Sequence, residues 1–205
     1  RLPICNDIRH KKERIIALLL ADAGARPSDI ARLYRTFEGW RMQMDFHNKG
    51  VRIRFFYPKE VVPGSSRGNS TGYYFSSWVE LLRSEPRSIS TPECLRDFLD
   101  SSSSDEFATI HIPELDSESQ PLLYGKRAKG QFQPASVDHI SNVAKATLGE
   151  AGMHSMTARS IRGASPSKIV QLFPDLLPQA LKLGRSTNSK TFVNHYQAKV
   201  NLVTS

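Results

Sequence analysis

The chain has 205 residues, of which 39% are hydrophobic and 23% are charged, and its formal net charge is +8 at pH 7. The hydrophobic fraction is ordinary for a globular domain and excludes a largely disordered chain. No uninterrupted apolar run approaches the ~20 residues that a membrane-spanning helix needs. The excess positive charge is spread along the chain, so it favours a polyanionic partner, nucleic acid before an acidic membrane surface.

The length fits one domain, which we place over residues 1–205. Because the chain opens with Arg1 rather than Met, we expect this domain to be a fragment of a longer protein. Cys5 and Cys94 lie far apart and in no metal-ligand spacing. This arrangement favours free thiols in a reducing compartment over a disulfide scaffold.

Two helices are predicted near the start of the chain. From Arg9 to Ala23 a broad apolar stripe follows charged first turns, and Gly24 ends this helix. Pro27 is at a position that suits the first turn of a second, shorter helix. The apolar face of the second helix consists of Ile30, Leu33 and Tyr34.

A β region follows. Apolar and polar residues alternate strictly from Trp40 to His47, which predicts a half-buried strand with Gln43 on its polar face. Val51 to Tyr57 and Tyr73 to Leu81 are predicted as the second and third strands, with a polar loop from Pro63 to Gly72. We expect one small antiparallel sheet between Trp40 and Leu81, and less strand content in the rest of the chain.

The remainder is predicted to be mostly helical. Thr91-Pro92-Glu93 is typical of a helix start, and another helix begins at Ser136 and ends near Gly149 and Gly152. The acidic stretch from Ser101 to Gln120 is expected to be an exposed insertion, extended around Thr109 to Ile112. The predicted fold class is therefore α+β, mainly α, with a small three-stranded antiparallel sheet.

The first candidate for chemistry is the stretch Gly24-Ala25-Arg26-Pro27-Ser28-Asp29. Arg26 lies in the turn between two predicted helices, where its guanidinium can point outward from a fixed backbone. Asp29 is placed to brace it. The alternative is an ordinary surface arginine at a helix start.

The second candidate is Lys59, at the end of the second predicted strand, and Lys49 on the preceding turn is its rival. Either lysine can also be an edge-strand residue that discourages aggregation.

The third candidate is the pair Arg159 and Arg162, which share one helical face. Two guanidiniums on one face suit a phosphate, because Arg binds phosphate oxygens in a bidentate manner. The alternative is a solvated basic face. Pro166 predicts that this helix kinks or starts late.

The fourth candidate is the C-terminal stretch that contains Arg185 and Tyr196. The alternative for Tyr196 is core packing, since Phe192 and Val200 fall at helical spacing on the same side.

Taken in this order, the four stretches resemble the motifs of tyrosine recombinase catalytic domains, especially the divergent type of mobile elements. The resemblance extends from Arg9 to Gln197. The first box is matched at Gly24, Arg26, Ser28, Ile30 and Leu33. The sequence departs from the family at three positions: Asp29 replaces Glu, Arg159 replaces His, and Arg185 replaces His or Trp. His154 is a possible substitute for the histidine, at the wrong spacing.

The resemblance implies a helical DNA breaking–rejoining domain without its usual N-terminal DNA-clamp domain. It implies a site-specific recombinase or integrase in which Tyr196 forms a 3′-phosphotyrosyl intermediate and Lys59 protonates the leaving 5′ oxygen. Charge on the phosphate would be stabilised by Arg26, Arg159, Arg162 and Arg185. Further DNA contacts are expected at Arg52, Arg54, Lys126, Arg127 and Lys190.

The same resemblance implies no metal and no cofactor, double-stranded DNA as the partner, and a homotetramer assembled on DNA. No membrane partner is expected. The expected location is inside the cell with DNA, in the nucleus of a eukaryote or the cytoplasm and nucleoid of a bacterium. Three alternatives remain open: a catalytically degenerate DNA-binding domain, a type IB topoisomerase, and a basic helical scaffold with protein partners.

Overall fold

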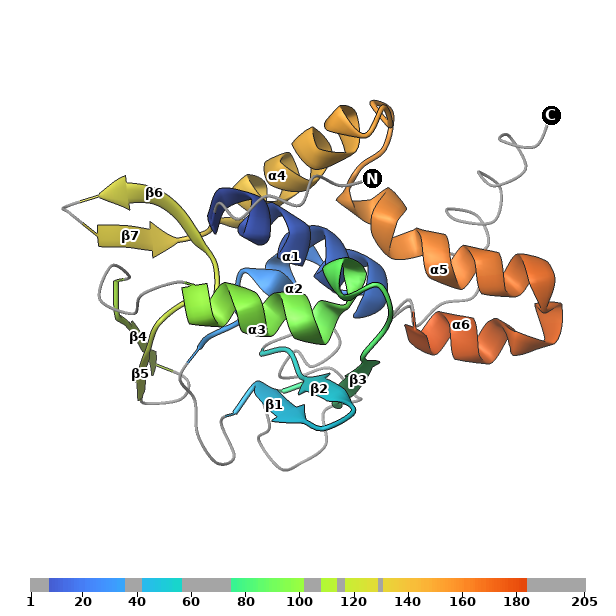
Figure 1. The fold of residues 1–205 in the computed structure, drawn as a ribbon, viewed down its shortest axis with the longest axis horizontal. Helices are drawn as coiled ribbons and strands as arrows, with labels where there is room; N and C mark the ends of the chain where they lie inside the picture. Colours follow the sequence, from blue (N-terminus) through green and yellow to red (C-terminus); the bar gives the residue numbers. More distant parts are fainter. Residues whose placement is uncertain are drawn as a thin grey trace.

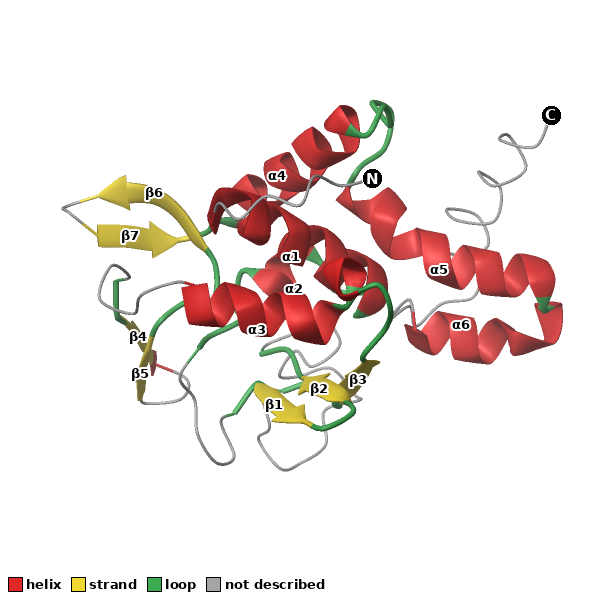
Figure 2. Ribbon diagram, viewed as in Figure 1, coloured by secondary structure: helices red, strands yellow, loops and turns green. Residues whose placement is uncertain are grey.

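The computed structural model describes residues 8–35, 42–56, 75–101, 108–113, 117–128 and 131–183. Figures 1 and 2 show helices grouped around a central α1, with small sheets at the periphery. The described helices are α1 (Ile8–Asp22), α2 (Pro27–Ile30), α3 (Thr91–Ser101), α4 (Val137–Glu150), α5 (Ala158–Leu172) and α6 (Leu177–Leu183). Two short 3₁₀ helices are η3 (Arg87–Ile89) and η6 (Pro174–Leu176).

Helix α1 organises the core. It packs against α3, α4 and α5, and Figure 1 shows it between them. Four of its aliphatic side chains are fully buried: Ile15, Ile16, Leu19 and Leu20. Each such side chain contributes roughly 1.5–3 kcal/mol when it leaves water, so this stripe is a main source of stability. The predicted bounds of this helix differ from the observed ones by one residue at each end.

The predicted three-stranded sheet is present. Its strands are β1 (Met44–His47), β2 (Gly50–Ile53) and β3 (Val79–Leu82), in the order β1-β2-β3, and both pairs are antiparallel. Gly50 is needed at the start of β2, because a Cβ there would collide with the backbone oxygen of Leu81 on β3. Below α3 in Figure 1, the sheet contacts that helix through β2 and β3.

The prediction that Gln43 lies on a polar face is wrong. Its side chain is only 1% exposed. Its Oε1 accepts a hydrogen bond from the Tyr34 N–H (2.9 Å), and its Nε2 donates to the Arg32 carbonyl (3.0 Å). Gln43 precedes the paired part of β1, so the strand period does not decide its environment. These hydrogen bonds to backbone groups offset the cost of removing the Gln43 amide from water.

The prediction of a single sheet is also wrong. Two further antiparallel hairpins are present, β4 (Ile110–Ile112) with β5 (Ser117–Ser119), and β6 (Tyr124–Ala128) with β7 (Gln131–Pro134). Together they contain more strand residues than β1 to β3 do. Alternation of apolar and polar residues in these strands is confined to short stretches such as Ile110-His111-Ile112, which predict an extended segment but not a paired hairpin. The Tyr124 and Phe132 rings, 4.5 Å apart, help to hold β6 against β7.

The stretch from Ser101 to Gln120 is not simply exposed. Ala108, Ile112 and Ser119 are buried, and the extended part expected near Ile112 is β4. These side chains reach the body of the domain because β4 lies beside the segment after α2, where Ile110 and Ile112 pack in one cluster with Tyr34.

Helix α5 does not start late. It begins at Ala158, so Arg159 and Arg162 lie in its first turns, and it continues through Pro166 to Leu172. A proline inside a helix removes one hydrogen bond and crowds the preceding turn. Pro166 and Val170 are buried, and α5 packs against both α1 and α6, so tertiary packing offsets that cost.

Candidate functional site

The turn between α1 and α2 holds Arg26 in a defined position. Gly24 ends α1 with a positive φ of 56°, a conformation that glycine adopts without strain. Arg26 then has extended backbone angles and precedes α2 directly. The Asp29 carboxylate accepts a hydrogen bond from the Arg26 backbone N–H at 2.8 Å. The predicted bracing of Arg26 by Asp29 is therefore present.

Asp29 also faces the guanidinium of Arg26. Arg26 Nη1 lies 4.0 Å from Asp29 Oδ2, and the side chains are 22% and 2% exposed, respectively. A buried carboxylate is stable only when it is paired and hydrogen-bonded, and Asp29 satisfies this through both ends of Arg26. Asp29 thus fixes the backbone of Arg26 and lies at ion-pair distance from its guanidinium.

Arg162 reaches this turn from α5. Its Nε donates a hydrogen bond to the Gly24 carbonyl at 2.8 Å, across 138 positions of sequence. Gly24 is two residues before Arg26, so the two segments identified separately in the sequence meet at one place. The helix pair that creates this meeting is α1 and α5, which pack directly. Arg159, one turn earlier on α5, is exposed.

Several predicted site residues lie outside the described residues. They are Lys59, Arg185, Lys190 and Tyr196. The backbone of Arg127 is part of β6, but its side chain is not among those described. The alternatives His154 and Lys49 are both exposed, His154 in the turn before α5 and Lys49 in the β1–β2 turn.

The two arginines predicted to contact DNA from the sheet differ in environment. Arg52 is exposed on β2; its Nη2 pairs with Asp45, and its Nε lies 3.1 Å from the same carboxylate. Arg54 is half-buried, and its Nε donates to the Met42 carbonyl at 2.7 Å. Its guanidinium stacks 4.6 Å from the centre of the Trp78 ring, and burial lowers the pKa of Arg54 below its ordinary value. Arg54 thus has a structural role, whereas Arg52 remains accessible.

A buried lysine was missed by the sequence analysis. Lys12 is 8% exposed, although it belongs to the charged first turns of α1. Its Nζ lies 3.3 Å from His139 Nε2 on α4 and 4.7 Å from the centre of the Tyr124 ring on β6. Desolvation first, then Lys12 and the exposed Lys126, lower the pKa of His139. Nothing in the local pattern separates Lys12 from its neighbour Lys11, because α4 and β6 decide which of them is covered.

The chain matches no model of a known protein family, and no curated protein matches it. Among the described residues, no group of His, Cys, Asp or Glu side chains is arranged to hold a metal ion. Within the same ranges, no helix has both the length and the apolar character that crossing a membrane requires.

Proposed function

We propose that the chain is the catalytic domain of a tyrosine recombinase, which cleaves and rejoins double-stranded DNA through a 3′-phosphotyrosyl intermediate. The observation that carries the proposal is the hydrogen bond from Arg162 Nε to the Gly24 carbonyl. It joins the first arginine segment to the second, which lie far apart in the sequence.

The proposed chemistry needs positive charge that is in place before reaction. A phosphodiester gains negative charge on its non-bridging oxygens as it is attacked, and preorganised donors stabilise that charge without moving. The Arg26 backbone is fixed by Asp29, and Arg162 is fixed by Gly24. The backbone of Arg26 and the side chain of Arg162 are thus held in place before any substrate binds.

The covalent step is assigned to Tyr196. Its hydroxyl oxygen bonds to phosphorus, the bond to the 5′ oxygen breaks, and Lys59 donates the proton that the 5′ oxygen gains. The proton lost from Tyr196 passes to water, and water returns a proton to Lys59, so the step balances; attack by a 5′ hydroxyl on the phosphotyrosine reverses it. A free tyrosine has a pKa near ~10, so the neighbouring arginines must favour the developing phenolate.

One feature favours a second candidate, a DNA-binding domain that has lost cleavage. Arg159 occupies the position where the family has histidine, and an arginine cannot accept a proton near neutral pH. Arg159 is exposed at the start of α5, so it can contact phosphate in either candidate. The two candidates therefore agree on DNA binding and differ in cleavage.

Nicked suicide DNA separates them. After cleavage the short product diffuses away, so a covalent protein–DNA adduct accumulates and is visible on a denaturing gel. We expect the wild-type chain to form this adduct. Tyr196→Phe should abolish it while leaving duplex affinity unchanged, because the substitution removes one oxygen and little packing.

Other outcomes assign the alternatives. If the chain binds duplex DNA but forms no adduct, it is a DNA-binding domain that has lost cleavage. If Tyr196→Phe forms the adduct as well as the wild type does, the nucleophile is another residue. Relaxation of supercoiled DNA without joining of two different duplexes would favour a type IB topoisomerase. Absence of any salt-sensitive DNA affinity would leave the helical scaffold.

A further inference from the structure

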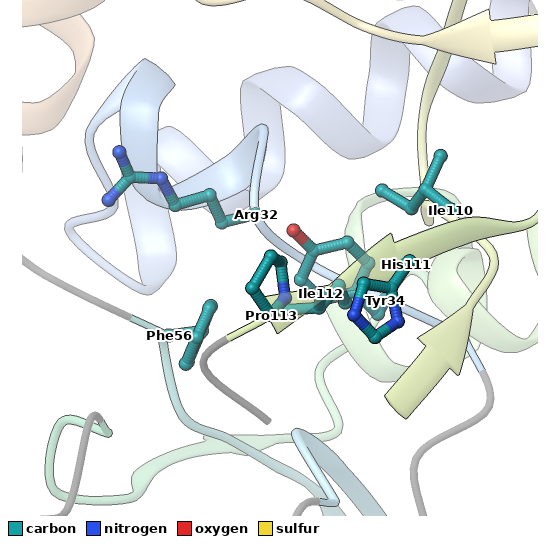
Figure 3. Close-up of a pocket in the computed structure, with 7 residues that line it drawn as sticks. All are labelled: Arg32, Tyr34, Phe56, Ile110, His111, Ile112 and Pro113. Carbon is teal, nitrogen blue, oxygen red and sulfur yellow. The ribbon is translucent and has the colours of Figure 1, made fainter. Parts of the chain in front are cut away.

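A pocket of about 310 Å³ opens between three segments that are distant in sequence. Arg32 and Tyr34 come from the segment after α2, Phe56 follows β2, and the remaining lining comes from β4 and Pro113 (Figure 3). The volume is near the lower limit of the roughly 300–1,000 Å³ of small-molecule pockets. It therefore suits one planar ring with its immediate substituents.

The wall after α2 is held on two sides. The Gln43 side chain bonds to the backbone of Tyr34 and Arg32. The Arg35 N–H donates to the Gln120 carbonyl at 2.9 Å. With these bonds in place, the pocket is preformed and a ligand does not have to order this wall.

The lining of the pocket is mixed: its exposed surface is at least as polar as it is apolar, and the side chains buried behind it are aromatic and aliphatic. Tyr34, Phe56 and Ile112 are buried and form a cluster separate from the main core. The Tyr34 and Phe56 rings meet edge to face with centres 6.4 Å apart. Pro113 is exposed at the lip. A flat ring with polar edges suits a lining in which aromatic and aliphatic side chains lie next to polar groups.

The rim of the pocket carries hydrogen-bond donors. Arg32 and His111 are exposed, and in Figure 3 they flank Tyr34 and Pro113 from opposite sides. A guanidinium binds phosphate oxygens, and an imidazole has an N–H to donate in either protonation state. A nucleotide within a strand has a phosphate on each side of its base, so this arrangement complements it. The net charge of +8 favours the same polyanion.

We propose that this pocket binds one unpaired nucleotide of a DNA strand, with the base inside and the flanking phosphates on Arg32 and His111. The inference rests on the proposed function, since the strand belongs to the DNA that the domain would cleave. Arg26 directly precedes α2 and Arg32 follows it, so one short helix connects the proposed catalytic arginine to the pocket.

The test compares two duplexes of identical sequence, one fully paired and one with a single extrahelical base. Fluorescence anisotropy with the whole chain should show tighter binding to the second, by at least about fivefold, the lower end of what stacking of one base contributes. Arg32→Gln and His111→Ala should each reduce this preference to near unity. Both positions are exposed, so folding should survive.

Matched controls isolate the pocket from general charge. Lys145→Gln removes one exposed positive charge on α4, and Thr109→Ala shortens an exposed side chain just before β4. Neither residue lines the pocket, and both variants should keep the wild-type preference for the extrahelical base.

Equal affinity for the two duplexes would overturn the proposal, as would a preference that persists in both rim variants. If a free deoxynucleoside monophosphate at low concentration abolishes the tighter binding to the duplex with the extrahelical base, the pocket binds a free nucleotide. That result would overturn the proposal that it binds a nucleotide within a strand. A preserved preference without any adduct on suicide DNA would remove the proposed function alone. An adduct without any preference would remove the pocket assignment alone.

Discussion

Arg162 reaches the α1–α2 turn from α5, whereas Arg52 and Arg54 lie two residues apart at β2. The first contact joins positions separated by 138 residues, and it exists only when α1 and α5 have packed. Arg52 and Arg54 share one face because side chains alternate along a strand, and both lie near Trp78. Strand periodicity is thus enough to place Arg52 and Arg54 together. A site that contains arginines distant in sequence forms only after α1 and α5 have packed.

The largest expected effect concerns the contact between Arg162 and the α1–α2 turn. Arg162→Ala removes a donor from the proposed phosphate site and the contact with Gly24, so adduct formation on suicide DNA should fall by at least about 100-fold. Arg87→Ala, which removes an exposed positive charge outside both regions, should leave the adduct yield unchanged. Circular dichroism should verify that both variants are folded. Similar yields from both variants would disconnect Arg162 from the reaction.

An intermediate effect should separate the two sheet arginines. Arg54→Ala leaves the Met42 carbonyl without its donor and opens the stacking with Trp78, which should lower the free energy of unfolding by about 1–3 kcal/mol. Arg52→Ala loses a solvent-exposed pair with Asp45 and a longer contact (5.5 Å) with the exposed Trp78 ring, and should cost only ~0–1 kcal/mol.

Urea unfolding measures both values, and the salt dependence of duplex binding supplies a second readout. Arg52→Ala should reduce the log–log salt slope by ~0.9 if Arg52 contacts one phosphate. Equal unfolding free energies for the two variants would contradict the division between a structural and an accessible arginine.

The smallest expected effect concerns the Lys12–His139 contact, where a lysine that also donates to the Tyr124 carbonyl (3.4 Å) lies beside a titratable imidazole. The pKa of His139 is lowered in the folded chain, so the unfolded chain binds more protons between that pKa and the ordinary ~6.5. Stability should therefore be complete above pH ~6.5 and decrease as the pH falls below it.

Urea midpoints measured from neutral to mildly acidic pH test this expectation. His139→Gln keeps a hydrogen-bond acceptor for Lys12 but cannot be protonated, so its stability profile should be flatter than that of the wild type. A wild-type profile that matches the variant would show that this contact does not respond to pH.

Much of the fold could be predicted because its signals are local. Gly24 and Pro27 mark a helix end and a helix start by their own backbone geometry, and the apolar stripe of α1 follows from helical spacing. The hairpins β4–β5 and β6–β7 could not be predicted in this way, because they are held by backbone pairing and by contacts such as Tyr124 with Phe132. Alternation in these strands is confined to short stretches such as Ile110-His111-Ile112, which cannot show by themselves which segment pairs with which.

The candidate site divides in the same way. The sequence by itself determined which residue types were available, including Arg26 with Asp29 one turn later, since both belong to one short segment. Only the tertiary structure decided that Arg162 meets Gly24, that Gln43 and Lys12 are buried, and that Arg32 and His111 share a pocket. Each of those outcomes depends on surfaces supplied by distant segments. Local periodicity contains no information about which surface will cover a given side chain, because packing is a property of the whole chain.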